Sequence, residues 1–280
     1  MVKIITDTLS DIPSQLAQEL GITVVPLNIH FGNDIYRDGV DLSTDEFYQK
    51  LTTGEAFPIT SAPVPGVFIE TFTKLAEETD EILAIMPSHE FGAMYESALR
   101  AKAMMKTGCH IEVIDSLLAV GGEMLVVIKA AKAARAGANL EQISDMVKKT
   151  IPRIHTRMVF DTLEYLRQGG RIGKAQAFLG SLLKVNAILG VKNGEVVPIA
   201  RARNRALAID FLVNFVKGFP KIESLVIEHA TTPDELEILA ERLREIFPKE
   251  QMYRSKVGAV VGAHVGPHIL AVSVLEGEIT

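Results

Sequence analysis

The stretch DTLEYLRQGGRIGKAQAFLGSLL, residues 161–183, places two apolar segments of helical pattern on either side of Gly169-Gly170-Arg171. A plain joint between two helices needs only one glycine. Two glycines followed by an arginine therefore predict a tight corner where the backbone closely approaches another part of the molecule. After the corner comes an apolar stripe, which is typical of a helix face packed into a core. Its members are Phe178, Leu179, Leu182 and Leu183.

Outside this stretch, short apolar runs alternate with helical patterns along the chain. In the first half, extended segments are predicted at residues 2–6, 22–31, 81–86 and 110–114. A second cycle begins near Thr156, with strands predicted at 157–160, 224–229 and 269–275 and a hairpin around Asn193-Gly194. This alternation predicts an α/β fold with a largely parallel sheet covered by helices. A boundary near Pro152 predicts two α/β domains, residues 1–152 and 153–280.

Local polar patterns predict how some of these elements begin. Ser43 with Glu46, and Thr232 with Glu235, have the spacing of capping boxes, the second with Pro233 at the first helical position. Asp11 is predicted to cap the helix that follows it. Asp7 comes directly after a strand and is predicted to hold a loop by accepting backbone N–H bonds.

Composition excludes several classes of protein. The chain has 280 residues, 48% of them hydrophobic and 23% charged, which is an ordinary globular balance with enough apolar residues for a sizeable core. A net charge of -6 without any basic run argues against nucleic-acid binding. A single cysteine, Cys109, excludes an internal disulfide framework and cysteine-rich zinc sites. Without a signal-peptide core or a membrane-length apolar run, the sequence predicts a soluble cytoplasmic protein with no stable membrane insertion.

Motifs that suggest catalysis or metal binding fail on spacing. In GGRIGKA three residues separate Gly169 from Gly173, and Ala175 follows Lys174, so the segment is not a Walker loop. His264 and His268 have i, i+4 spacing, but Gly266-Pro267 between them breaks the helix that a shared metal would need. We therefore predict no metal site, no cofactor and no catalytic residue.

Two segments place small hydroxyls or glycine where a loop enters a helix. These are Pro58-Ile-Thr-Ser61 and the run from Ser88 to Tyr95. Helix N-termini bind anions through free N–H groups and the helix dipole. Thr60, Ser61, Ser88 and backbone N–H groups near Gly92 could hold one carboxylate or phosphate. Plain N-capping of two helices is the alternative interpretation.

Taken in order, these segments resemble the DegV family of fatty-acid-binding proteins along nearly the whole chain. The matching pieces are Ile4-Ile-Thr-Asp7-Thr, Tyr36-Arg-Asp-Gly39, Thr60-Ser61, Ile114-Asp115-Ser116, Asp161-Thr-Leu-Glu-Tyr-Leu with Gly169-Gly-Arg-Ile172, and Gly262-Ala-His264-Val-Gly-Pro267. The segment around Gly169 is the most specific of them.

The resemblance implies two α/β domains with a lipid tunnel between them. A long-chain fatty acid would lie in the tunnel, with its carboxylate held by the Thr-Ser hydroxyls near the closing-motif histidine. The implied ligand-binding residues are Thr60, Ser61, Ser88, Gly92, Ala93, Arg171, His264, Gly266 and His268. Family members of this type present the acid to an ATP-dependent fatty acid kinase and have no catalytic group of their own. The expected partners are thus a fatty acid and such a kinase.

This chain departs from the family pattern at the head-group end. The family's Leu-Ser-Gly-Thr-Tyr reads Phe91-Gly92-Ala93-Met94-Tyr95, and its closing Gly-Pro-Gly ends in His268. Losing one hydrogen bond to a charged group costs about 1.5–3 kcal/mol. Burying a sixteen-carbon tail contributes roughly 12 kcal/mol gross, at about 0.8 kcal/mol per methylene. Tail binding is therefore expected to survive a change of head-group contacts.

Two other functions remain open from the residues alone. One is a phospho-carrier or kinase-related enzyme that uses His264, and the other is a regulatory module that binds another small carboxylate. Arg171 likewise has two interpretations: a cation at the tunnel mouth or for a docking partner, or an ion-paired residue at a helix end.

Overall fold

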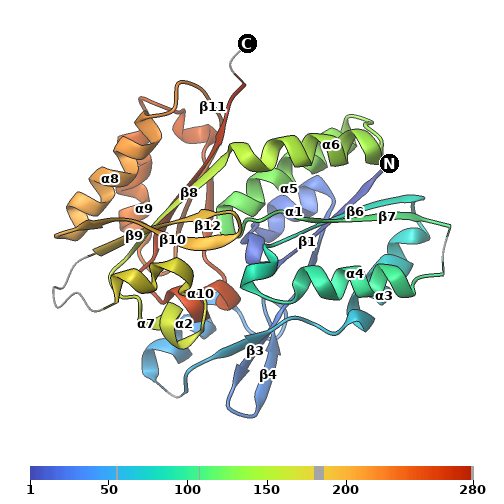
Figure 1. Cartoon of the computed structure of the whole chain (residues 1–280), viewed down its shortest axis with the longest axis horizontal. Coiled ribbons are helices and arrows are strands. Elements are labelled where there is room, and N and C mark those ends of the chain that lie inside the picture. The colour runs from blue at the N-terminus through green and yellow to red at the C-terminus, as the bar shows by residue number, and fades with distance from the viewer. Residues whose placement is uncertain (55, 107, 180–185, 279–280) are drawn as a thin grey trace.

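The computed structural model of the chain describes residues 1–280 except 55, 107, 180–185 and 279–280. It contains three β-sheets with helices packed on and between them (Figure 1). The mixed α/β fold is confirmed. Pro152 lies in a short 3-10 turn, Ile151–Arg153, between the last helix of the first half and the first strand of the second. The division into domains 1–152 and 153–280 stays a prediction.

The first sheet is parallel, as predicted, and has the strand order β2-β1-β6-β7. Its strands are β1 (Lys3–Asp7), β2 (Ile22–Val25), β6 (Glu81–Met86) and β7 (His110–Asp115). Alternate strand residues contact helices on opposite faces. One face packs on α1 (Ser14–Leu20), α5 (Val120–Arg135) and α6 (Leu140–Thr150), and the other on α3 (Pro65–Ala76) and α4 (Met94–Met104).

The second sheet has six strands in the order β10-β9-β8-β13-β11-β12 and is mostly antiparallel. Its strands are β8 (Ile154–Phe160), β9 (Asn186–Lys192), β10 (Glu195–Ala202), β11 (Ile222–His229), β12 (Tyr253–Lys256) and β13 (Leu270–Glu276). Only β11 and β12 pair in parallel. The prediction of a largely parallel sheet was therefore wrong for the second half of the chain. The Asn193-Gly194 turn joins β9 directly to β10, and a tight hairpin forces neighbouring strands to run in opposite directions.

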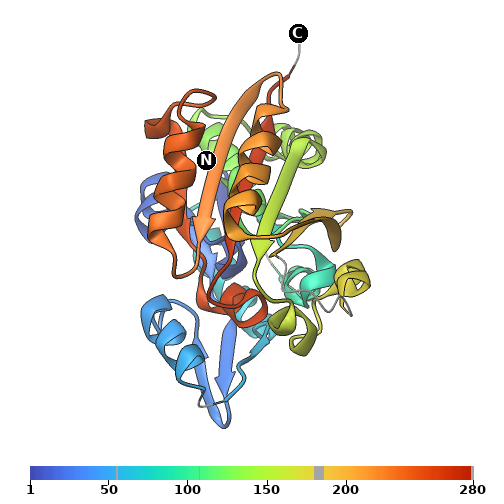
Figure 2. The ribbon, with the colours of Figure 1, turned by 90° about the vertical axis from the view of Figure 1, so that its left-hand side faces the viewer.

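Helices cover the second sheet on both sides. On the outer side, α8 (Arg205–Lys217) and α9 (Pro233–Leu243) lie next to each other, as Figure 2 shows. On the inner side, α5 contacts β8, β11 and β13 as well as β1 of the first sheet. A helix between two sheets must be apolar nearly all round, and α5 has buried residues on every side.

The third sheet is small and antiparallel, with the order β4-β3-β5, and projects from the body in Figure 1. Its strands are β3 (Asn28–Phe31), β4 (Asp34–Arg37) and β5 (Ile59–Ser61), and α2 (Thr44–Thr53) lies between β4 and β5 in the chain. The sequence suggested one extended run over residues 22–31. The run is divided because Pro26 lacks an N–H for the sheet ladder, so β2 and β3 belong to different sheets.

The segment around His264, for which the sequence predicts no helix, forms helix α10 (Ala259–Val265). Six of its seven residues are buried, and the helix contacts α2, β3, β5 and α7 (Glu164–Gln168). A short helix of small residues can approach its neighbours closely on all sides, and this tertiary packing decides the structure. Gly266, with a φ of 79°, ends it.

The predicted caps had mixed outcomes. Ser43 and Glu46 form the capping box, and Asp7 accepts a hydrogen bond from the backbone N–H of Leu9. Thr232 makes no side-chain cap, so the second capping box was wrong. Asp11 does not cap α1. It accepts a hydrogen bond from the backbone N–H of Gly258, far along the chain.

Among the described residues, no helix combines the length and the apolar character that a membrane span requires.

Candidate functional site

Thr60 and His264 form the polar centre of the site. Thr60 is the middle residue of β5, and its side chain points to the inner face of the small sheet, where Oγ1 lies 2.7 Å from Nε2 of His264 in α10. Side chains alternate along a strand, so the neighbouring Ser61 points to the other face and bonds His30. The two hydroxyls of the predicted Thr-Ser pair therefore face different environments.

His264 is partly buried and neutral over the physiological pH range. Burial of the ring, followed by the positive charge of Arg171, lowers the pKa of His264 from 6.5 to about 4. Its Nδ1 atom is buried and has no hydrogen-bond partner among the described residues. A neutral imidazole carries one proton. With that proton on Nε2, the ring donates to Thr60 and leaves the hydroxyl hydrogen of Thr60 free for a ligand.

The pKa of His264 can be measured directly in protein stripped of ligand. We expect the imidazole to titrate near pH 4 by NMR, because its neutral form is favoured in the fold. The corresponding contribution to stability is present above pH 6.5 and lost as the pH falls through 4. His89 serves as an internal reference, since its hydrogen bond to Asp115 raises its pKa. A His264 midpoint near 6.5 would contradict the buried geometry.

The prediction that the backbone at Gly169-Gly170 closely approaches another part of the molecule is confirmed, and that part is the ring of His264. A Cβ atom at Gly169 would overlap Nδ1 of His264 and would lie 3.0 Å from the carbonyl oxygen of Tyr165. Gly170 has a φ of 70°, which L-residues with side chains rarely adopt. Only glycine at 169 lets the backbone pass the imidazole ring, so this corner fixes the ring in place.

Replacing Gly169 with alanine tests this role. We expect a loss of about 1–3 kcal/mol in the free energy of unfolding, as for other overpacked cores, together with weaker ligand binding because His264 is displaced. Gly66→Ala in α3 is the matched control, because its added methyl group would meet only one atom, at 3.9 Å. Equal denaturation midpoints for Gly169→Ala and the wild type would contradict the close approach.

Arg171 follows the corner and points between the two halves of the chain. Its Nη1 donates to the carbonyl oxygen of Gly169 at 2.8 Å, and its Nε donates to the carbonyl oxygen of Phe91 at 3.1 Å. No carboxylate of the described residues lies within ion-pair distance of the guanidinium. The helix-end interpretation of Arg171 required such a partner, whereas a half-buried cation without one is suited to bind an anion.

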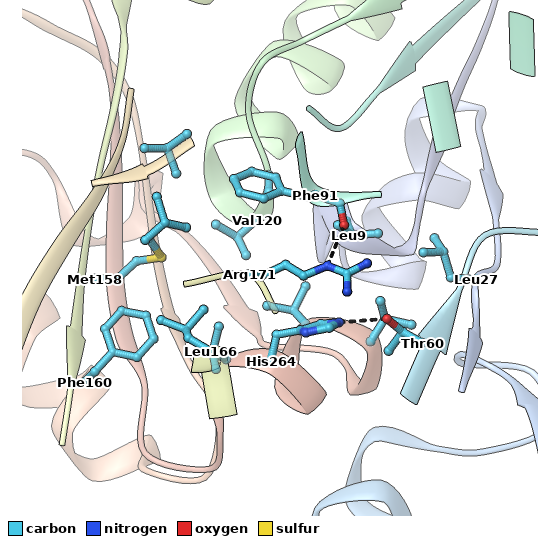
Figure 3. A pocket seen from close by; sticks show the side chains of 16 residues that line it. Leu9, Leu27, Thr60, Phe91, Val120, Met158, Phe160, Leu166, Arg171 and His264 are labelled. Atoms are coloured by element: carbon cyan, nitrogen blue, oxygen red, sulfur yellow. Dashed lines mark hydrogen bonds between the residues drawn. The ribbon is translucent and has the colours of Figure 1, made fainter. Parts of the chain in front are cut away.

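An apolar cavity adjoins these three polar side chains. The halves of the chain both contribute to its wall, and the empty space inside, including the part open to solvent, is about 630 Å³. Figure 3 shows Met158 and Phe160 on one side of it and Thr60 on the other, with His264 and Arg171 between them. The remaining wall residues are apolar: Leu9, Leu27, Phe91, Ala119, Val120, Leu166, Val191, Val196, Val260, Val261 and Val265.

A second hollow continues from the polar end of the cavity toward the surface. It shares Leu27, Thr60, Phe91 and Arg171 with the cavity. Ser61, Gly92 and Ala93 line it, together with the charged side chains of Glu96 and Arg100. A ligand with its tail in the cavity and its polar end at Thr60 would therefore be reachable from outside through this hollow.

The other sequence-predicted residues lie elsewhere. Ser88 is buried, accepts a hydrogen bond from the backbone N–H of Glu90, and lines neither hollow. Gly266 packs on the Tyr165 ring, and His268 is exposed in the turn after α10. Their roles in ligand binding stay predictions. The apolar stripe also lies apart from the wall: Phe178 and Leu179 do not line the cavity, and Leu182 and Leu183 are outside the described residues.

Comparison with known proteins agrees with this geometry. The family model described as the uncharacterised DegV family matches residues 1–277. A DegV domain-containing protein from Caldanaerobacter subterraneus subsp. tengcongensis is 37% identical over 270 residues, covering 95% of each chain. Among solved structures, a DegV family protein from Thermus thermophilus, described as fatty acid binding, has 30% identity and a TM-score of 0.90 over 99% of both chains. DegV from Bacillus subtilis, described as a fatty acid binding protein, has 28% identity and a TM-score of 0.88, covering 98% of this chain and 99% of that one. The chain therefore belongs to the DegV family.

Proposed function

We propose that this protein binds one long-chain fatty acid, with the tail in the apolar cavity and the carboxylate at Thr60 and Arg171. The observation that carries this proposal is the combination of an apolar cavity with one polar end that contains a cation, Arg171, without a carboxylate partner among the described residues. Relatives with the same fold are described as fatty acid binding proteins.

The tail provides most of the binding free energy. Of the sixteen described residues that line the cavity, only Thr60, Arg171 and His264 have polar side chains. Each methylene group transferred from water to such a wall contributes about 0.8 kcal/mol. Short polar acids cannot use this surface, which favours a long-chain ligand over the small carboxylate that the sequence left open.

The carboxylate head group accepts hydrogen bonds from donors of the site that have no other acceptor among the described residues. The hydroxyl of Thr60 donates to one carboxylate oxygen while its own oxygen accepts from Nε2 of His264. Arg171 has Nη2 available, since its hydrogen bonds to the described residues use Nε and Nη1. A charge-assisted bond from a guanidinium is stronger than one between neutral groups. The neutral imidazole thus orients the hydroxyl, and the arginine supplies the charge.

In this proposal the protein is a carrier in the cytoplasm and not an enzyme. It uses no cofactor, and it presents the carboxylate through the outer hollow to an ATP-dependent fatty acid kinase. The hollow begins at Thr60 and Arg171, where the carboxylate lies, and Gly92 and Ala93 leave its wall free of large side chains.

A phospho-carrier role for His264 finds no support in the geometry. Nδ1 lies against the Gly169 backbone and Nε2 is bonded to Thr60, so neither nitrogen is open to a phosphodonor. An acid-labile mass increase after incubation with a phosphodonor, lost in His264→Ala, would reverse this conclusion.

Mass spectrometry of the purified protein tests the carrier function. After denaturation and extraction, we expect a long-chain fatty acid in near-equimolar amount. A clean extract, together with no uptake of palmitate or oleate by the same protein, would contradict the proposal.

A further inference from the structure

Five carboxyl groups are buried together behind one wall of the proposed fatty acid cavity. Asp7, Glu123 and Glu228 have 0% exposure, Asp38 has 4% and Asp11 has 8%. They come from β1, the segment after it, the segment after β4, α5 and β11, so the cluster joins both halves of the chain. The fatty acid site described above does not use them. We call these five residues the carboxyl cluster.

The carboxyl cluster holds the halves together through backbone hydrogen bonds. Glu228 accepts from the backbone N–H of Gly121 at 2.8 Å, and Asp11 accepts from that of Gly258, also at 2.8 Å. Each of these bonds joins a residue of the first half to one of the second. Asp38 accepts in the same way from the backbone N–H of Val260 at 3.3 Å.

The segments that make these bonds also form the cavity wall. Leu9, between Asp7 and Asp11, lines the cavity, and so do Ala119 and Val120, next to Gly121. The third segment is α10 with its N-cap. The N-cap Gly258 binds Asp11 and Val260 binds Asp38, while Val260, Val261 and His264 line the cavity. Separating the carboxyl cluster would therefore open the wall.

Part of this wall is under backbone strain. Val120 has a φ of 50° and Asp11 a φ of 48°. A β-branched residue at positive φ is disfavoured and persists only where surrounding contacts hold it. Gly121, the residue after Val120, donates the hydrogen bond to Glu228. Loss of this bond would let the backbone at Val120 relax and release the strain.

The carboxyl cluster lacks charge compensation. Within the part of the chain that the structure describes, no lysine, arginine or histidine lies within ion-pair distance of its oxygens. One oxygen on each of Asp7, Asp11, Glu123 and Glu228 is buried without a hydrogen-bond partner there. Ionised carboxylates in this setting carry a large desolvation cost, so the groups are favoured in the neutral form.

The surrounding titratable groups do not change this balance. Tyr48 faces the cluster from α2 and donates to the carbonyl oxygen of Val257, and burial raises its pKa further. His229 ends β11, and burial and Lys256 lower its pKa. Lys256 and Arg254 on β12 pair with Asp45 and Glu237 at the surface. Burial accordingly raises the pKa of Asp7 and of Glu228 to about 8.

Resting on the proposed function, we propose that the carboxyl cluster is a proton-dependent latch: its neutral form holds the cavity wall closed, and opening of the wall to release the fatty acid is coupled to loss of protons. A surface hollow lined by Asp7, Asp11, Asp38 and His229 gives water a route to the cluster. On opening, the carboxyls become hydrated and return toward their ordinary acidity. Release then becomes easier as the pH rises toward 8 and levels off above it.

The rate of fatty acid release as a function of pH tests this latch. Protein loaded with a fluorescent fatty acid is mixed with excess phosphatidylcholine vesicles between pH 6 and pH 9. Each group that regains its ordinary pKa on opening changes the opening equilibrium about tenfold per pH unit below its folded pKa. We expect at least a roughly tenfold faster release at pH 8 than at pH 6, followed by a plateau.

Amide variants identify the groups responsible. Asp7→Asn with Glu228→Gln mimics the neutral acids and keeps their acceptor oxygens, so release at pH 6 should stay slow and the rise between pH 6 and pH 8 should be at least about fivefold smaller than in the wild type. Glu141→Gln, an exposed carboxyl on α6, is the matched control and should follow the wild type. If the double variant does not fold, the single variants Asp7→Asn and Glu228→Gln replace it. Each should remove part of the rise in release rate with pH.

The outcomes separate the latch from the binding function. A fluorescent fatty alcohol should show the same rise, because its head group does not titrate. If the protein binds the fatty acid but the wild-type rate is flat from pH 6 to pH 9, the latch is wrong and the carrier function stands. If the rise is undiminished in the amide variants, Asp7 and Glu228 do not cause it and the latch is equally wrong. If no fatty acid binds at any pH, the proposed function itself fails.

Discussion

Val261→Phe is expected to weaken fatty acid binding by at least about 100-fold without lowering the stability of the fold. Val261 lies in α10, is 7% exposed and faces the cavity. The larger ring would occupy space that the proposal assigns to the alkyl tail. Displacing about four methylenes removes roughly 3 kcal/mol, at 0.8 kcal/mol each and 1.4 kcal/mol per tenfold in affinity. The measurement is displacement of a fluorescent fatty acid by palmitate.

The same substitution should leave thermal unfolding nearly unchanged in ligand-free protein, because the ring fills space that is already empty. Val40→Phe is the matched control, since Val40 is 57% exposed and remote from the wall. Wild-type affinity in Val261→Phe would mean that the tail does not lie in this cavity. A large fall in the unfolding midpoint would mean that the cavity has no room for the ring.

Arg171→Leu is expected to weaken palmitate binding by about 10- to 100-fold, while binding of the corresponding alcohol changes less than about twofold. Removing a hydrogen-bond partner from a charged group costs about 1.5–3 kcal/mol, and the alcohol lacks that charge. Titration calorimetry with the two ligands measures both numbers. The comparison isolates the carboxylate contact, because any general damage to the cavity affects both ligands.

Two further variants complete this experiment. Arg171→Lys keeps the charge and should restore part of the palmitate affinity, although it cannot reproduce the fork geometry of a guanidinium. Arg167→Leu, on the exposed side of α7 and paired with Glu164, is the matched control. Equal losses for palmitate and the alcohol in Arg171→Leu would show that the arginine supports the wall and does not bind the head group.

Sequence reasoning located the site where local chemistry is unusual. Gly169-Gly170 predicted a close approach, and the partner proved to be His264, about a hundred residues away in the chain. The resemblance to the family placed His264 near the ligand's carboxylate, but nothing in the sequence paired it with Gly169. Thr60 and Arg171 were found from their residue types, because a hydroxyl and a cation stand out from apolar neighbours.

The cavity wall left no such signal. Met158, Val191 and Val196 alternate along their strands as any inward residues do, and a pattern does not distinguish a side chain that faces empty space from one that faces another side chain. Phe178 shows the same limit, because it packs against the core, as its stripe predicts, and yet does not line the cavity. The guanidinium of Arg201 lies over its ring, with 4.2 Å between the guanidinium carbon and the ring centroid.

Long-range partners also explain the errors at the carboxyl cluster. Asp11 has the residue type and position of a helix cap, and only the fold shows that it accepts from Gly258 instead. Helix α10 was missed because its small residues have weak propensity of their own and are ordered by what packs around them. Such features depend on segments that meet only after folding.

The most direct test of the account is a crystal structure of the protein with bound palmitate. The account predicts an alkyl chain along Met158, Phe160 and Val261, with the carboxylate within hydrogen-bond distance of the Thr60 hydroxyl and the Arg171 guanidinium. A cavity filled by side chains, or palmitate bound elsewhere, would contradict it.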